Sequence, residues 1–187
     1  MHIELQQVAP AEIEARSMEI IRSELKQPLP PEQEAVILRA IHTTADFDYA
    51  KNLCFSPNAV QRGVEALRGG ADIVTDTTMA MSGINKRVLA KFGGQVYNYI
   101  ADGDVAAEAR ERGITRAAVS MERAAAMGKP LIYAIGNAPT ALVRLYEMWC
   151  DGTLPTPALI VGVPVGFVNV VEAKELIMEM EIGRAHV

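Results

Sequence analysis

The sequence predicts an α/β protein in which an open, mostly parallel sheet has helices on both faces and is preceded by two N-terminal helices. Two observations lead to this fold class. From Ser56 onward, short β-branched runs alternate with helical stretches, and these stretches end on glycine. Strands that alternate strictly with helices are joined by right-handed crossovers, so they run parallel and are covered on both faces.

Two helices are expected ahead of the sheet, over roughly Ala11–Leu25 and Glu32–Ile41. The proline-rich segment Gln27–Pro31 separates them, because proline has no backbone N–H with which to continue a helix. Both helices therefore belong to a segment that precedes the alternating part of the chain.

Four strands are expected at short apolar or β-branched segments: Asp72–Thr75, Gln95–Tyr99, Leu131–Ile135 and Ala158–Val161. Five helices are expected around them: one opened by Ser56-Pro57, one over Ile84–Phe92, one capped by Asp104 and ended by Gly113, one from Thr115 to near Gly128, and one over Thr140–Cys150. Ligands of such sheets bind at the carboxyl ends of the strands. A site is therefore expected in the segments Asp76–Gly83, Gly136–Thr140 and Gly162–Asn169.

The composition indicates one folded domain, expected over residues 1–180. The chain has 187 residues, 50% of them apolar, and a chain of this size buries roughly 70% of its extended-chain surface. No run of about 18 apolar residues lacks a charge, Gly or Pro, so we expect no membrane span. Met1–Gln6 has no basic segment followed by an apolar one, so we expect no secretory signal and a cytoplasmic location.

The net charge of -5 argues against a nucleic-acid-binding surface, since phosphate neutralisation needs a clustered cationic excess. Cys54 and Cys150 lie outside any CxxC or Cys/His cluster, so we expect buried reduced thiols rather than a disulfide or a zinc site. The common phosphate-loop, nucleophile-elbow and HExxH signatures are missing. We therefore expect neither a metal nor a cofactor.

His42 is the histidine best placed to act as an acid or base, because His2 lies at a terminus and His186 in a doubtful tail. It follows the second expected helix, and Arg39, three residues earlier, shares its helical face. By residue type alone, a satisfied core or capping histidine is the commoner alternative.

Two strings place polar groups at expected helix starts. Gly136–Thr140 directly follows an apolar strand, so its backbone amides can hold a carboxylate; the alternative is a plain turn capped by Asn137. Thr115-Arg116 opens another helix, where an anionic partner would explain an arginine that gains nothing from the helix dipole. Its alternative is a solvated cap.

Three other positions are more ambiguous. Arg16-Ser17 lies within the first helix, where an exposed arginine beside a tolerated serine is the simpler interpretation. Asp76, after the first strand of the alternating part, is either a ligand or a turn acceptor. Met79 is expected to fill the core together with Met81.

Taken together, these strings resemble the precorrin-8X methylmutase family, also called cobalt-precorrin-8 methylmutase, of corrin (vitamin B12) biosynthesis. The match runs from about Ile13 to Leu176. Its most specific pieces, in the family's order, are Arg16-Ser17, Arg39-x-x-His42-Thr43-Thr44, Thr75-Asp76 with Met79 and Gly83, Thr115-Arg116, Ile135–Leu142, and Gly162-x-Pro164-Val165-Gly166-Phe167-Val168 with Glu172 and Lys174.

The resemblance implies an isomerase that moves a methyl group from ring carbon 11 to carbon 12 of precorrin-8X or cobalt-precorrin-8, giving hydrogenobyrinate or cobyrinate. The family's acid/base histidine falls on His42, and its substrate-contacting serine and arginine fall on Ser17 and Arg39. The resemblance also implies a homodimer. The segment His42–Asp48 looks closer to the cobalt-containing branch of the family.

A corrinoid precursor is a broad apolar ring fringed by carboxylates, so its site is expected to be a large apolar cleft edged with Arg and amide donors. Protonating the conjugated ring changes its electron demand, and imidazole, with a pKa of about 6.5 in model peptides, suits that step. We predict that His42 donates the proton. The residues predicted to bind the substrate are Ser17, Arg39, Arg16, Thr43, Arg116, Asn137, Pro139, Thr140 and Gly166.

Members of the family normally continue through another strand, a glycine-rich loop and a last helix, none of which is seen here. The final segment, Glu181–Val187, resembles the translation of a sequencing adapter, so it is predicted to be a non-native tail and is left out of the fold prediction. The missing elements are expected to leave an unpaired sheet edge. Two alternatives remain open: a corrinoid-binding fragment or carrier without catalysis, and an unrelated α/β nucleotide-binding enzyme.

Overall fold

The computed structural model describes residues 8–180 and 184–186, and the chain divides into two compact units, residues 1–53 and 54–187. The sheet belongs to the second unit. The single domain expected over residues 1–180 stays a prediction. In the described part of the chain, no helix is long and apolar enough to cross a membrane.

The first unit contains the two helices expected ahead of the sheet. Its elements are the 3-10 turn η1 (Pro10–Glu12) and the helices α1 (Ile13–Glu24), α2 (Glu34–Thr44) and α3 (Tyr49–Asn52). α1 and α2 contact each other and bury Ile21, Ile37, Leu38 and Ile41. α2 continues past its predicted end at Ile41 and stops where Ala45 takes a left-handed backbone, at φ 55°. His42 therefore lies inside the last turn of this helix.

The second unit is built on a six-stranded sheet in the order β1-β6-β5-β4-β2-β3. Its strands are β1 (Cys54–Phe55), β2 (Asp72–Thr75), β3 (Val96–Tyr97), β4 (Leu131–Ile135), β5 (Leu159–Gly162) and β6 (Arg184–His186). The pairs from β3 through β2, β4 and β5 to β6 are parallel, whereas β1 runs antiparallel to β6. The predicted open, mostly parallel α/β sheet is confirmed.

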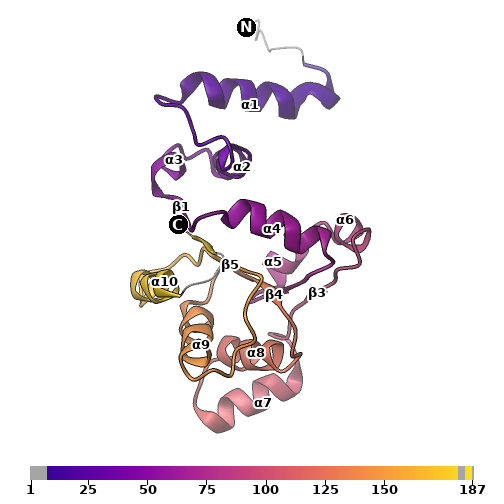
Figure 1. Ribbon diagram of the computed structural model, residues 1–187, viewed down its shortest axis with the longest axis vertical. Helices are drawn as coiled ribbons and strands as arrows, with labels where there is room; N and C mark the ends of the chain where they lie inside the picture. The colour runs from indigo at the N-terminus through magenta and orange to yellow at the C-terminus, as the bar shows by residue number, and fades with distance from the viewer. Residues whose placement is uncertain (1–7, 181–183, 187) are drawn as a thin grey trace, which may run out of the picture. The chain divides into compact units, whose positions relative to one another are not determined.

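Seven helices accompany the described strands of this unit: α4 (Ala59–Arg68), α5 (Thr78–Gly83), α6 (Lys86–Ala90), α7 (Gly103–Arg112), α8 (Arg116–Ala125), α9 (Pro139–Cys150) and α10 (Val170–Glu179). Alternate residues of a strand point to opposite faces of its sheet. Leu131, Tyr133 and Ile135 of β4 join one core with α8, α9 and α10, whereas Ile132 joins another with α4 and α6. Helices thus cover both faces, and Figure 1 shows α4 on the opposite side of the strands from α8 and α9.

Several predicted boundaries are wrong. The N-cap of α4 is Asn58, at φ 59°, and not Ser56, because a left-handed asparagine delays the helix by two residues. The N-cap of α7 is Asp102, and Asp104 lies in its first turn. The strand expected over Gln95–Tyr99 is reduced to Val96–Tyr97, and α5 was not predicted. Thr115 caps α8 as predicted, since its hydroxyl accepts the N–H of Ala118.

Three expectations about exposure and edges are also wrong. Cys54 and Cys150 are exposed and not buried, because they lie on the edge strand β1 and at the last residue of α9. Met79 is 85% exposed and does not fill the core. Residues Arg184–His186, left out of the fold prediction, form β6 and pair with β5, so the edge expected to be unpaired at β5 is occupied.

Candidate functional site

In the first unit, His42 and Ser17 line the same small pocket, of about 240 Å³, with apolar neighbours from α1, α2 and the segment after α2. His42 is exposed and therefore is not the satisfied core histidine of the simpler alternative. Ligand pockets usually measure roughly 300–1,000 Å³. The pocket that His42 itself lines is therefore smaller than the cleft expected beside it. A second pocket of this unit, of about 460 Å³, shares Glu24 and Phe47 with it but is not lined by His42.

The hydroxyl of Ser17 donates to the carbonyl of Ile13 at 2.9 Å, and that of Thr43 donates to the carbonyl of Arg39 at 2.9 Å. Both bonds follow the four-residue spacing of a helix. These bonds use the hydroxyl hydrogens but leave each oxygen able to accept a further bond. Ser17 and Thr43 are thus free to accept hydrogen bonds from a ligand.

The arginines of the first unit are paired with the protein's own carboxylates. Arg39 contacts Glu14 at 2.6 Å, and Arg16 contacts Glu19 at 3.1 Å. The hydrogen bond from Arg39 lowers the pKa of Glu14, and the nearby His42 adds a smaller effect in the same direction. Because both pairs are exposed, a substrate carboxylate can replace Glu14 or Glu19 at little cost.

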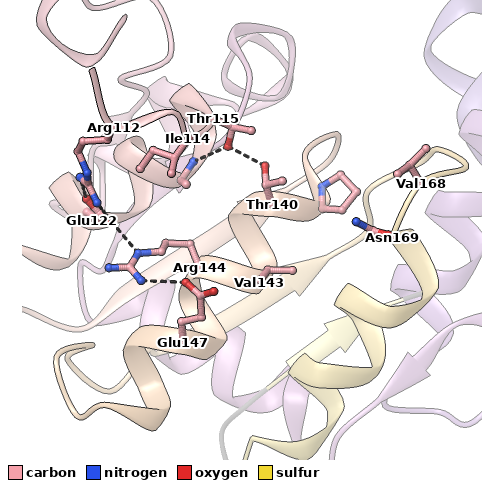
Figure 2. Close-up of a pocket in the computed structure, with 12 residues that line it drawn as sticks. Arg112, Ile114, Thr115, Glu122, Thr140, Val143, Arg144, Glu147, Val168 and Asn169 are labelled. Carbon is pink, nitrogen blue, oxygen red and sulfur yellow. Dashed lines mark hydrogen bonds and ion pairs between the residues drawn. The ribbon is translucent and has the colours of Figure 1, made fainter. Parts of the chain in front are cut away.

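In the second unit, a pocket of about 540 Å³ opens between α7, α8, α9 and the loop after β5 (Figure 2). Pro139 and Thr140, both predicted site residues, line it together with Thr115 and with Val168 and Asn169 of the loop. The hydroxyls of Thr115 and Thr140 lie 2.8 Å apart. The structure therefore brings the predicted segments Thr115-Arg116 and Gly136–Thr140 together at one pocket. The sequence did not predict this contact, because the two threonines are 25 residues apart.

The remaining predicted residues of this unit, Arg116, Asn137 and Gly166, are not among the residues that line this pocket. Arg116, the first residue of α8, donates to the carbonyl of Ile100 at 3.3 Å. Gly166 is exposed in the loop after β5, next to Phe167, which is fully exposed. Asn137 is exposed and does not cap α9, whose N-cap is Ala138.

The backbone amides expected to hold a substrate carboxylate are already occupied. Asp76 accepts the N–H groups of Gly136 at 3.0 Å, Asn137 at 2.8 Å and Ala138 at 2.6 Å. The alternative in which Asp76 is a turn acceptor is thus confirmed, and the predicted anion site is filled by the protein's own side chain. The N–H groups of this turn are therefore not available to a ligand.

One wall of the larger pocket carries a chain of ion pairs that was not predicted. Glu122 accepts from Arg112 at 2.9 Å and from Arg144 at 2.7 Å, and Arg144 also contacts Glu147 at 2.8 Å (Figure 2). These residues come from α7, α8 and α9, so no spacing in the sequence could reveal the network.

Within the described part of the chain, no group of three His, Cys, Asp or Glu could hold a metal ion.

Replacing Glu122 by Gln should destabilise the protein by about 1 kcal/mol at pH 7. Hydrogen bonds from Arg112 lower the pKa of Glu122 from 4.5, so this stabilisation is present above that value and is lost as the pH falls through the lower folded-state pKa. Urea unfolding at pH 7 and pH 3.5 measures both effects. The wild type should lose more stability on acidification than E122Q. E147Q, at the exposed end of the network, is the control. Equal losses of stability on acidification in wild type and E122Q would contradict the prediction.

The comparisons with known proteins agree with this architecture. The precorrin-8X methylmutase family model matches residues 12–186. A cobalt-precorrin-8 methylmutase from Salmonella typhimurium is 46% identical over 173 residues, which cover 89% of this chain and 80% of that protein. One from Priestia megaterium is 40% identical, covering 94% of this chain and 78% of its own length.

A solved structure supports the same relationship through the fold. The crystal structure of a precorrin-8X methylmutase from Thermus thermophilus superposes with a TM-score of 0.84 at 36% identity, covering 94% of this chain and 86% of the other. Because sequence and fold agree over nearly all of both units, this chain belongs to the precorrin-8X methylmutase family.

Proposed function

We propose that this protein is an isomerase of cobalamin biosynthesis, which moves a methyl group from carbon 11 to carbon 12 of precorrin-8X or cobalt-precorrin-8. The observation that carries this proposal is the family match over residues 12–186. Relatives at 40% identity carry either name, and the relative at 46% identity is named a cobalt-precorrin-8 methylmutase, which favours the cobalt-containing substrate. The proposal includes a homodimer, as the resemblance implies, and a cytoplasmic location.

His42 is proposed as the general acid that protonates the conjugated ring. It is exposed in the last turn of α2 and faces the same pocket as Ser17, so a ring placed there can reach both side chains. General acid catalysis typically contributes roughly 100- to 10,000-fold. Ser17 and Thr43 would accept hydrogen bonds, and Arg39 and Arg16 would bind ring carboxylates in exchange for Glu14 and Glu19.

In the second unit, Pro139 and Thr140 are proposed to contact the ring edge, since they line the larger pocket. Arg116 and the side chain of Asn137 would bind carboxylates, and Gly166 would let the ring approach the exposed loop after β5. A methyl shift needs no redox partner. This proposal therefore requires no step from a cofactor.

A visible-spectrum assay with the metal-free and the cobalt-containing precursor tests the function. An enzyme converts an excess of precursor completely, whereas a corrinoid carrier gives only a stoichiometric spectral change. We expect complete conversion at low enzyme ratios, faster with the cobalt precursor. A change that stops at one equivalent with both precursors would contradict catalysis and support the carrier.

A further inference from the structure

The carboxylate of Asp76 is the most deeply buried acidic side chain of the described residues, at 1% exposure. Burying a charge is costly unless hydrogen bonds replace its water. Among residues 8–180, no Lys or Arg forms an ion pair with it. Its compensation comes from the three N–H groups of Gly136, Asn137 and Ala138 and from the N-terminus of α9, which favours negative charge.

Only a carboxylate satisfies this arrangement. Asp76 accepts through both oxygens, one toward Gly136 and the other toward Asn137 and Ala138. An asparagine in the same place has a single oxygen, and its NH₂ group would point at a backbone N–H. A buried N–H without an acceptor costs roughly 1–3 kcal/mol, so the charge has a role that a neutral side chain of the same shape does not fill.

The strand end that carries Asp76 is itself held in place. Thr75 pairs with Ala134 of the neighbouring strand β4, so Asp76 comes level with the end of β4. The side-chain amide of Asn98 donates to the carbonyl of Thr75 at 2.9 Å and to its hydroxyl at 3.1 Å. Asp76 therefore connects a fixed point of the sheet to the turn 136–138.

That turn leads directly into the larger pocket. Pro139 and Thr140 follow it and line the pocket wall, and Thr140 contacts Thr115, which caps α8 (Figure 2). A change in the turn would therefore move two pocket walls, the start of α9 and the start of α8. His42, the proposed general acid, belongs to the other unit.

We propose that Asp76 is a positioning residue of the isomerase, whose carboxylate holds the turn 136–138 so that Pro139 and Thr140 contact the substrate. This inference rests on the proposed function. Asp76 acts through the turn and does not touch the substrate itself. Its effect should therefore fall on substrate binding and not on the chemical step.

The test compares D76N with D72N. Asp72 is also buried, at 6% exposure, but lies at the opposite end of β2, where it accepts the N–H of Gln95 at 2.7 Å and pairs with Lys129. Both variants should lose stability. D76N should raise KM roughly tenfold with kcat within about threefold of wild type, because the turn supplies uniform binding. D72N should leave KM within about threefold at a comparable loss in Tm.

Equal KM values in D76N and D72N would overturn the inference, because the effect of D76N would then be one of stability alone. Should D76N not fold, D76E keeps the charge and displaces it by one methylene, and an unchanged KM in D76E would overturn the inference equally. A wild type that binds the precursor without converting it contradicts the proposed function alone. In that case spectral titration gives the dissociation constants of D76N and D72N in place of KM. A larger dissociation constant in D76N alone would support the inference, and equal values would overturn it.

Discussion

Replacing His42 by alanine should lower turnover of the precursor by roughly 100- to 10,000-fold, because the variant loses the proposed general acid. His42 is exposed at the end of α2, so its removal leaves no cavity and should change stability by less than about 0.5 kcal/mol. The dissociation constant of the precursor should stay within about threefold, since the arginines proposed to bind its carboxylates are unchanged. Single-turnover kinetics and spectral titration measure the two effects separately.

The matched control is Thr44→Ala. Thr44 lies two residues away on the same helix end, is exposed, and donates its hydroxyl to the carbonyl of Ala40 at 2.8 Å. T44A should turn over at the wild-type rate. Unchanged turnover in the His42 variant would exclude this residue as the acid, and equal losses in both variants would attribute the effect to the helix end.

Replacing Leu142 by alanine should destabilise the protein by roughly 2–5 kcal/mol. Leu142 is fully buried in α9, in the core that this helix forms with α8, α10, β4 and β5. Such a loss is a large fraction of the free energy of unfolding, which is typically 5–15 kcal/mol for native proteins. Urea unfolding followed by circular dichroism measures this loss. The slope of the unfolding free energy against urea concentration should stay unchanged.

Val171→Ala is the control for this prediction, because Val171 also lies in a helix of the same layer but is 63% exposed. Its loss should be within about 0.5 kcal/mol. A Leu142 variant as stable as the Val171 variant would show that α9 does not pack as described. The two variants together therefore test the layer that positions Pro139 and Thr140.

Much of the fold could be predicted because its signals are local. The apolar segment Leu131–Ile135 forms β4 with the predicted bounds, and the hydroxyl of Thr115 caps α8 as predicted, since each signal acts within a few residues. The boundaries at Asn58 and Asp102 were missed. Several residues near each start could cap the helix, and packing of the helix selects among them.

The sequence by itself determined the fold class, the family and the residue types available for acid catalysis and carboxylate binding. Only the tertiary structure decided how those groups are used. It paired Arg39 with Glu14 across 25 residues, and it gave the amides of Gly136–Ala138 to Asp76 across about 60. The physical reason is that a hydrogen bond or ion pair depends on distance in space. The packing of α1 on α2 sets that distance for Arg39 and Glu14, and the parallel pairing of β2 with β4 sets it for Asp76, whereas sequence spacing sets neither.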